Sequence, residues 1–268
     1  MEDPVDFIKK KYGDNVRVLY MPNGGNQGDN LIAAATIQAF DRKGLKWQFL
    51  TGGAEQVRDG DVCVYGGGGA LVDMYEGGVA CLRFLQSLGR PVLVLPHTVR
   101  GHEDFWRASS GMTVFCRDAL SLEYLSGMPG IEAHGACDMA FGLSFQDDCL
   151  AAVKSFRDAI GERSSLVLDI FRGDGEAGRR PKGMKSWVDL SAIYYPKLNS
   201  TQSIMANAAC FLTALAPARL VRTDRLHVAV GAGLLGIEVH LYDNNYGKNS
   251  AVMEMAGFRL SSVRLMES

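Results

Sequence analysis

The sequence lacks the features of a membrane-spanning or secreted protein. No apolar run in the chain approaches the ~20 residues that a transmembrane helix needs. The N-terminal stretch MEDPVDFIKKKYGDN is polar and charged, so it does not resemble a secretory signal. We therefore expect a cytoplasmic protein.

Cysteine is sparse and dispersed. The six cysteines form no C-x-x-C pair, so the sequence indicates neither a structural zinc site nor a redox motif. We expect reduced thiols, as is usual in the cytoplasm. Cys63, Cys116 and Cys210 lie in apolar surroundings and are predicted to be buried as small hydrophobic residues.

Neither sign of charge dominates, and several catalytic signatures are missing. The formal net charge is -2, so no strongly basic surface for nucleic acid is indicated. The sequence contains no G-x-S-x-G nucleophile elbow and no H-E-x-x-H zinc motif. We therefore predict no catalytic metal and no bound cofactor.

What the sequence does contain is an alternation of short apolar strands and helices. Strands are predicted at 16–21, 47–50, 61–65, 91–95 (ended by Pro96), 114–116, 165–171, 220–223 and 238–242, and helices at 31–40, 71–88, 149–160 and 201–215. Such alternation is typical of a parallel sheet in a doubly wound α/β fold. The pattern pauses near residues 138–146. We therefore predict two Rossmann-like domains facing a cleft, an N-terminal one at 1–147 and a C-terminal one at 148–268.

One stretch of the second half concentrates the reactive side chains. Asp224, Arg225, Leu226 and His227 fall between a predicted strand and a helix of small residues that starts near Val228. In open α/β sheets, ligands bind at this edge of the sheet. An arginine can hold a carboxylate or phosphate through two parallel hydrogen bonds, and histidine has the side-chain pKa nearest neutrality. We predict an anion anchor at Arg225 and a proton donor at His227, whose alternative role is packing at the helix start.

A glycine-rich loop in the first half, GGNQGDN at 24–30, also joins a strand to a helix. A helix N-terminus presents free N–H groups to an anion, which makes Asn26, Gly28 and Asp29 candidate ligand contacts. The alternative is a tight turn in which Asp29 or Asn30 caps the helix.

A second glycine run, GGGGA at 66–70, ends a predicted buried strand. Four adjacent glycines cost conformational entropy, so we expect something to approach the backbone closely here. Gly67 and Gly68 are candidate ligand contacts, although the close neighbour could be only another strand.

Other polar groups follow further strands. His97 and Thr98 follow the strand at 91–95, Arg117 ends the next strand, and Arg172 follows the strand at 165–171. Arg117 and Arg172 are candidate anion clamps, and His97 and Thr98 candidate substrate contacts. The alternatives are a structural His97, an ion pair between Arg117 and Asp118, and a solvated charge at Arg172.

Two more charged residues have open roles. Asp138 stands in an apolar run, so it needs hydrogen bonds or a cation and is either structural or part of the site. Lys248 follows a turn and could contact phosphate. The segment 173–196 between them, rich in Gly, Arg and Lys, is predicted to be a loop that is mobile or closes on ligand.

Taken together, these stretches resemble the polysaccharide pyruvyl transferase family. The matching elements occur in family order between residues 22 and 249: GGNQGDN, GGGGAL, LPHTVRG, FCRDALS, CDMAF, TDRLHVAVGAGLLG and LYDNNYGKN. The family's Arg-Leu-His block, which is associated with donor binding and catalysis, falls on Arg225, Leu226 and His227. The YGKN stretch adds Tyr246, Lys248 and Asn249 as substrate-binding candidates.

The resemblance implies a GT-B-like pair of domains and a ketal-forming transferase. The pyruvyl group of phosphoenolpyruvate, a substrate and not a bound cofactor, would pass to a sugar in exopolysaccharide or cell-wall glycan biosynthesis. For this reaction we predict that His227 acts as general acid toward the methylene carbon.

Two other functions stay open at this stage. One is a glycosyltransferase that uses a nucleotide sugar on the same scaffold, because fold alone does not define function. The other is a non-catalytic glycan-binding protein. The sequence specifies neither the acceptor sugar nor the oligomeric state, and a lipid-linked acceptor would make peripheral membrane attachment natural.

Overall fold

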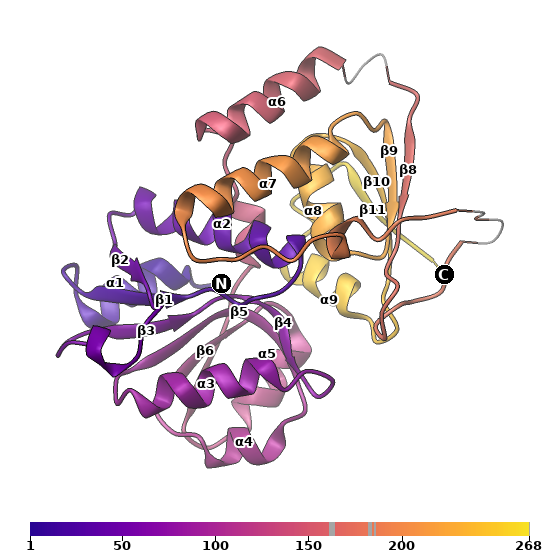
Figure 1. The fold of residues 1–268 in the computed structure, drawn as a ribbon. Coiled ribbons are helices and arrows are strands. Elements are labelled where there is room, and N and C mark those ends of the chain that lie inside the picture. The colour runs from indigo at the N-terminus through magenta and orange to yellow at the C-terminus, as the bar shows by residue number, and fades with distance from the viewer. Residues whose placement is uncertain (161–163, 182–183, 185, 268) are drawn as a thin grey trace. The chain divides into compact units, whose positions relative to one another are not determined.

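The computed structural model describes residues 1–160, 164–181, 184 and 186–267 of the chain (Figure 1). Contacts between Cα atoms divide the chain into two compact units. Unit 1 comprises residues 1–23 and 36–139, and unit 2 comprises residues 24–35 and 140–268. Residues 24–35, which precede most of unit 1 in the chain, therefore fold as part of unit 2.

Unit 1 is built on a parallel sheet. Its strands are β1 (Arg17–Met21), β2 (Lys46–Phe49), β3 (Val62–Tyr65), β4 (Gly68–Val72), β5 (Val92–Arg100), β6 (Met112–Cys116) and β7 (Ile131–Gly135). They run in the order β2-β1-β3-β5-β6-β7, and β4 pairs with β5. The α/β class with a parallel sheet, predicted from the sequence, is confirmed here.

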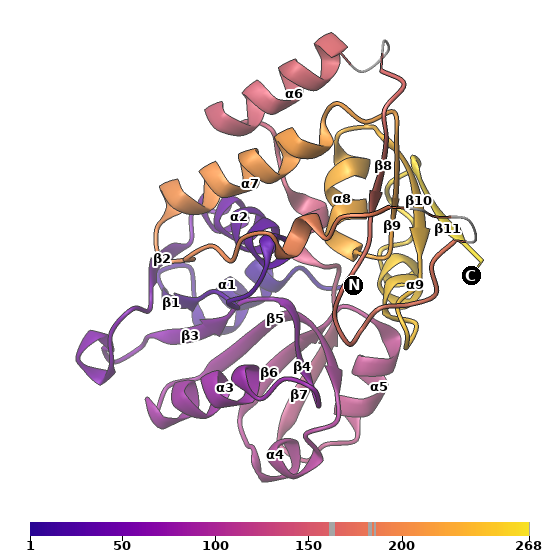
Figure 2. The same cartoon turned by 45° about the vertical axis from the view of Figure 1, so that its right-hand side comes forward.

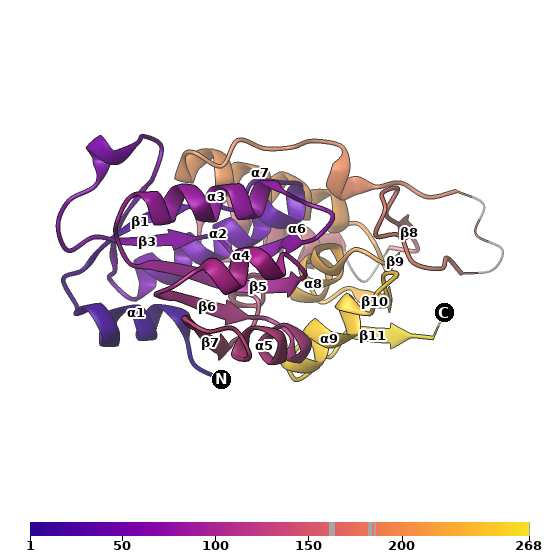
Figure 3. The same cartoon turned by 90° about the horizontal axis from the view of Figure 1, so that it is seen from below.

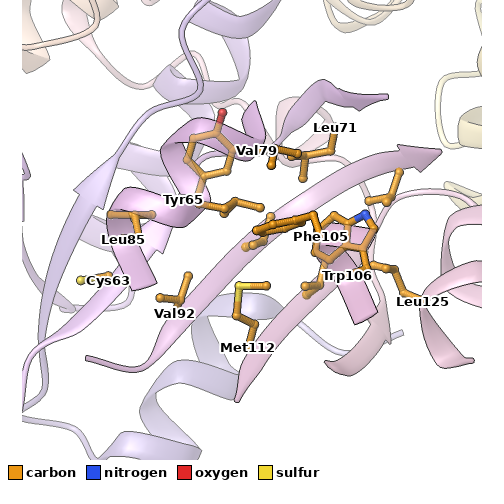
Figure 4. Packing of buried hydrophobic residues seen from close by; sticks show 14 of the residues in the cluster. Cys63, Tyr65, Leu71, Val79, Leu85, Val92, Phe105, Trp106, Met112 and Leu125 are labelled. Carbon is orange, nitrogen blue, oxygen red and sulfur yellow. The ribbon is translucent and has the colours of Figure 1, made fainter. Parts of the chain in front are cut away.

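Helices cover both faces of the unit 1 sheet. One face carries α3 (Gly77–Ser87), α4 (Glu103–Ala108) and α5 (Ala119–Ser126) (Figure 1 and Figure 3). The core beneath them includes Phe105 and Trp106, which meet edge to face with ring centroids 4.9 Å apart, and Met112 of β6 (Figure 4). On the other face, Phe7 of α1 (Pro4–Tyr12) packs edge-on against Phe115. The sheet is thus buried on both sides, which explains its continuous apolar strands.

Two predicted element boundaries in unit 1 were wrong. The strand expected to end at Pro96 continues to Arg100, and its pairing register shifts between Val94 and His97. A proline is tolerated at such an irregularity because no ladder hydrogen bond is required of it. The helix expected at 71–88 begins only at Gly77, because residues up to Val72 form β4 beside β5.

Unit 2 contains a second, smaller parallel sheet. Its strands are β8 (Val167–Ile170), β9 (Leu220–Thr223), β10 (Glu238–Tyr242) and β11 (Val263–Met266), in the order β11-β10-β9-β8. The helices of this half are α6 (Asp148–Ile160), α7 (Thr201–Leu215), α8 (Leu226–Leu234) and α9 (Lys248–Met255). Strand β11 had no clear signal in the sequence.

Helices α7 and α8 lie on the same side of the unit 2 sheet (Figure 1 and Figure 2). The glycines of α8 allow this close packing. A Cβ added at Gly231 would come within 2.9 Å of Leu212 of α7, and one added at Gly233 within 2.8 Å of Val263 of β11. The small residues after His227 therefore let α8 sit deep against its neighbours.

The segment between β8 and α7 has little regular structure in its described residues. It contains an isolated bridge between Ile170 and Val188 and a short 3-10 helix at Leu190–Ala192. The loop predicted for this segment is therefore found, whereas its mobility or closure on a ligand stays a prediction.

Two further sequence expectations concern cysteines and membranes. Cys63 and Cys116 are buried as predicted, whereas Cys210 is exposed because it lies outside the set of buried positions of α7, which includes Ala208 and Phe211. Within the described ranges, no helix is long and apolar enough to cross a bilayer.

Candidate functional site

The structure gathers several of the predicted site residues into two clusters, one in each unit. The cluster in unit 2, here called the cation cluster, consists of three cationic residues and the three carboxylates that bind them: Arg172, Arg225, Lys248, Asp174, Glu176 and Asp189. These residues lie at or beyond the carboxyl ends of β8, β9 and β10. This is the edge of a parallel sheet at which ligands are expected.

Arg225 occupies the turn from β9 into α8. Its backbone N–H donates to Thr223 Oγ1 at 2.9 Å, which fixes the turn. Its guanidinium binds Asp189 through two parallel hydrogen bonds, with Nε 2.9 Å from Oδ1 and Nη2 2.5 Å from Oδ2. Asp174 Oδ2 lies 3.1 Å from the same Nη2. The buried arginine thus holds a carboxylate in the geometry predicted for a ligand.

Arg172 and Lys248 meet at a second carboxylate. Arg172 Nη2 lies 2.9 Å from Glu176 Oε1, and Lys248 Nζ donates to Glu176 Oε2. The same Oε2 accepts hydrogen bonds from Tyr246 Oη at 3.0 Å and Asn244 Nδ2 at 3.2 Å. Glu176 is buried, so these donors replace the water that its charge would otherwise need.

Asp174 and Asp224 have pKa values shifted in opposite directions. Partial burial opposes ionisation of Asp174, but the hydrogen bonds and charge of Arg172, with the charge of Arg225, lower its pKa to about 2. Burial raises the pKa of Asp224 above its ordinary value, although Oδ1 accepts the backbone N–H of Arg172 at 2.8 Å. Asp174 therefore stays ionised near neutral pH and opposes the charge of the two arginines.

Asn249 fixes the position of the Asp224 corner. Its Nδ2 donates to the carbonyl oxygens of Asp224, at 2.7 Å, and Tyr242, at 2.9 Å. The side chain thereby ties the end of β9 to the end of β10. Leu226, the next residue of the Arg-Leu-His block, is buried as the first residue of α8. These contacts indicate that Asn249 and Leu226 support the site, and direct contact with substrate stays a prediction for both.

His227 lies beside the glycine loop of residues 24–30. A Cβ added at Gly28 would come within 2.8 Å of His227 Nδ1 and 3.0 Å of His227 Cβ. The half-buried histidine therefore packs directly on the start of α2 (Gln27–Arg42). The structure thus brings two predicted site stretches together although about two hundred residues separate them.

The cap of α2 is neither Asp29 nor Asn30, the two residues that the sequence suggested. Asn26 Oδ1 accepts the N–H of Gly28 at 2.7 Å, and Asp29 Oδ2 accepts the N–H of Asn26 at 2.9 Å. This reciprocal pair is a capping box, so Asn26 is the cap and Asp29 its partner. Their side chains have structural roles, and their contact with a ligand stays a prediction.

The cluster in unit 1 centres on a buried ion pair. Arg117 Nη1 donates to Asp138 Oδ2 at 2.6 Å, and Arg117 Nε donates to Thr98 Oγ1 at 3.0 Å. Asp138 therefore has the cation that its burial requires. Arg117 does not pair with Asp118, whose pKa is held low, against its burial, by hydrogen bonds from Arg100 and Ser121.

His97 belongs to the same cluster and is neutral. Its ring stacks on Tyr65, and its Nε2 accepts the N–H of Ala70 at 3.2 Å. Burial, with the charge of Arg117, lowers its pKa to about 3. These are the interactions of a structural histidine, and substrate contact by His97 and Thr98 stays a prediction.

The second glycine run has two structural explanations. A Cβ at Gly66 would come within 2.4 Å of the backbone nitrogen of Asn23, so this glycine admits a neighbouring segment. Gly68 has a φ of 149°, which other residues rarely adopt. Gly67 is buried between them. Ligand binding by Gly67 and Gly68 therefore rests on the sequence resemblance alone.

Sequence reasoning missed the three carboxylates of the cation cluster. Asp174 and Glu176 could have been found, because they stand two and four residues after Arg172 in one loop. Asp189 had no such signal, because it lies 36 residues before Arg225 in a segment whose sequence has no periodic pattern. In the part of the chain that the structure describes, no group of three or more His, Cys, Asp or Glu residues is arranged to hold a metal ion.

The fold and the cation cluster define an α/β protein of parallel sheets, with three cationic residues paired to carboxylates at the strand ends of unit 2. A family model described as "Polysaccharide pyruvyl transferase" matches residues 26–246, which include every residue of the cation cluster except Lys248. The chain therefore belongs to the polysaccharide pyruvyl transferase family, and the family name denotes a transferase.

The chain is also similar to a solved structure, a functionally uncharacterised protein from Klebsiella pneumoniae subsp. pneumoniae NTUH-K2044. The two chains share 27% sequence identity with a TM-score of 0.74, and the match covers 98% of this chain and 97% of the other. No curated protein matches the chain.

Proposed function

We propose that this protein transfers the pyruvyl group of phosphoenolpyruvate to two hydroxyls of a sugar, forming a pyruvate ketal and releasing phosphate. The observation that carries the proposal is the cation cluster, with His227 two residues from Arg225, in a chain of this family. We further propose that the acceptor belongs to exopolysaccharide or cell-wall glycan synthesis and that the units adopt a GT-B-like arrangement.

The reaction balances with the groups present. One acceptor hydroxyl forms a C–O bond to C2 of the donor while a proton is added to the methylene carbon. The C2–O bond to phosphate then breaks, and the second hydroxyl forms the other C–O bond at C2. The two hydroxyl protons are recovered on the new methyl group and on phosphate. No oxidant or reductant is needed.

Donor binding would replace protein carboxylates on the arginines with the anionic groups of the donor. Phosphoenolpyruvate carries a carboxylate and a phosphate, both of which arginine binds through paired hydrogen bonds. Arg225 already holds the carboxylate of Asp189 in this manner. The donor's anionic groups would therefore take the place of Asp189 and Asp174 on the two arginines, while Glu176 stays between Arg172 and Lys248.

His227 would deliver the proton. Its imidazole is half-buried beside the backbone of Gly28, two residues along the chain from the proposed anion anchor. The imidazolium form of His227 would act as general acid toward the methylene carbon. Phosphoenolpyruvate is consumed in each turnover, so no bound cofactor enters this scheme.

Mass spectrometry of candidate glycans after incubation with phosphoenolpyruvate tests the proposal. A mass increment equal to a ketal-linked pyruvate, accompanied by phosphate release that depends on the glycan, is the expected result. Thermal stabilisation by UDP-sugars but not by phosphoenolpyruvate would instead identify a nucleotide-sugar transferase. Glycan binding without any phosphate release would identify a non-catalytic glycan-binding protein.

A further inference from the structure

Three aromatic side chains are exposed close together in the segment that binds Arg225. Trp187, Tyr194 and Tyr195 expose 40%, 52% and 63% of their surface. Isolated exposed aromatics are common, but three within nine residues of irregular chain are a local concentration of aromatic area open to a ligand. The residues Trp187, Tyr194 and Tyr195 are called the aromatic segment below.

Backbone and carboxylate contacts hold the residues that follow Trp187 beside the cation cluster. Val188 donates its N–H to Asp169 and accepts the N–H of Phe171, at 3.1 and 3.0 Å, which anchors the chain next to Trp187 on the end of β8. One residue further, Asp189 binds Arg225 and also accepts the N–H of Gly173 at 3.1 Å. The segment is thereby fixed to the proposed donor site through its backbone and its carboxylate.

The Trp187 ring is itself positioned. The guanidinium of Arg180 lies over the ring, with its central carbon 3.9 Å from the centroid, and Arg180 Nη2 donates to the carbonyl of Arg172 at 2.9 Å. A Cβ at Gly173 would lie 3.5 Å from Cη2 of Trp187. One face of the indole is therefore covered by a cation, and the ring lies beside the loop that carries Arg172.

The other end of the segment reaches the neighbourhood of His227. Gln27 Nε2 donates to the carbonyl of Tyr194 at 3.4 Å. The next residue, Gly28, is the one that packs on the imidazole of His227. The aromatic segment thus runs from the loop of the donor-binding arginines to the stretch that contacts the proposed acid.

We propose that Trp187, Tyr194 and Tyr195 form the platform that binds the acceptor saccharide. The proposal rests on the proposed function, which requires a sugar next to the reacting centre. A pyranose ring has C–H faces that pack on aromatic rings and hydroxyls that stay hydrated. Aromatic side chains with polar tips suit such a ligand, because they offer a large rigid apolar area at low conformational cost.

Saccharide binding can be measured without turnover. Intrinsic tryptophan fluorescence of the full chain is titrated with uncharged tri- to hexasaccharides of glucose, galactose, mannose and N-acetylglucosamine, in the presence of inorganic phosphate. The chain has only three tryptophans, and Trp106 is buried in unit 1. At least one saccharide is expected to change the fluorescence, and Trp187→Phe is expected to abolish the signal while retaining most of the affinity.

Truncating the rings separates the platform from the donor site. In calorimetric titrations, Trp187→Ala and Tyr194→Ala are each expected to weaken saccharide binding about tenfold, equivalent to about 1.4 kcal/mol for an aromatic contact. Thermal stabilisation by phosphoenolpyruvate should be unchanged. Phe156→Ala is the matched control, because Phe156 is an exposed aromatic of unit 2 on α6.

The outcomes show separately whether the saccharide platform fails and whether the proposed pyruvyl transfer fails. If no saccharide of the panel binds, or if Trp187→Ala and Tyr194→Ala bind as tightly as Phe156→Ala, the platform is overturned even when pyruvyl transfer occurs. If these variants instead lose binding to vesicles of anionic phospholipid with saccharide affinity unchanged, the segment is a membrane contact. Saccharide binding that depends on Trp187, without phosphate release, supports the platform and refutes the transfer reaction.

Discussion

His227 packs on the backbone of Gly28, and the contact leaves no room for a side chain at residue 28. The two residues belong to different stretches of the sequence, one predicted to contact a ligand and the other predicted to carry the catalytic acid. Their contact means that the orientation of the proposed acid depends on a helix start far away in the chain.

Gly28→Ala should therefore impair catalysis more than folding. The added methyl group would lie 2.8 Å from His227 Nδ1 and 3.0 Å from Asn26 Oδ1, so the imidazole must move. A displacement of about 1 Å at a catalytic group costs about 10²-fold in rate, whereas overpacking costs about 1–3 kcal/mol of stability. Turnover with phosphoenolpyruvate and the thermal midpoint are the measurements.

Gly24→Ala is the control for this substitution. Gly24 stands in the same loop, and a Cβ there meets no atom within 4 Å. Equal turnover in the two variants would show that the contact with Gly28 does not position His227 for the reaction.

His227→Gln should lower turnover by about 10²–10⁴-fold, because a general acid contributes that much. Donor affinity, measured by the phosphoenolpyruvate dependence of the thermal midpoint, should change little. His240→Gln is the control, since His240 is a half-buried histidine on β10 of the same unit. Wild-type turnover in His227→Gln would remove His227 from the mechanism.

Asp189→Asn should tighten the binding of anions. The amide keeps the shape of the carboxylate but removes the charge that neutralises Arg225, whose Nε and Nη2 both contact Asp189. Inorganic phosphate and phosphoenolpyruvate should bind about tenfold more tightly, equivalent to about 1.4 kcal/mol. Calorimetric titration measures the change.

A weaker affinity in Asp189→Asn would contradict the exchange of carboxylates proposed for donor binding. It would indicate instead that Asp189 organises Arg225 for the ligand. Asp169→Asn provides the control, because Asp169 forms a comparable paired contact with Arg222 on the neighbouring strands β8 and β9.

Stability should fall as the pH is lowered from 6.5, because His97 is buried in its neutral form. Its pKa is about 3 in the folded protein against an ordinary value of 6.5, so between these values only the unfolded chain gains the proton. Stability is therefore greatest above pH 6.5 and decreases as the pH falls through this window, by up to about 1.4 kcal/mol per pH unit.

Denaturant unfolding between pH 7 and 5 tests this linkage. His97→Gln, whose amide oxygen can accept the N–H of Ala70, should show a smaller pH dependence than the wild type over this interval. Equal slopes in both proteins would mean that His97 takes up a proton in the folded state as readily as in the unfolded chain.

The parallel α/β class and the family were predictable from the sequence because both depend on local patterns. Short apolar strands alternate with helices, and the TDRLH block stands at a strand end as predicted. The elements that were missed depend on distant partners. Strand β4 exists only because its backbone pairs with β5, and β5 continues past Pro96 through a register shift.

The carboxylates of the cation cluster show the same limit. An arginine after a strand is visible in the sequence, but its partner is not. Asp189 stands 36 residues before Arg225, and no spacing rule connects the two. The cap of α2 was local and still misassigned, because Asn26, Asp29 and Asn30 are all good capping residues and only the geometry selects among them.

Helix α2 has a consequence for any attempt to divide this protein. Its first residues fold with unit 2, where Asn30 donates to the carbonyl of Ile204 and Leu31 approaches Gly231. In a fragment that starts at α6, Ile204 of α7 and Gly231 of α8 would lose their contacts with Asn30 and Leu31. The fragment would also lack Gly28 beside His227. Neither half can therefore be produced intact by a single cut, and a two-fragment complementation experiment would have to supply residues 24–35 together with the C-terminal piece.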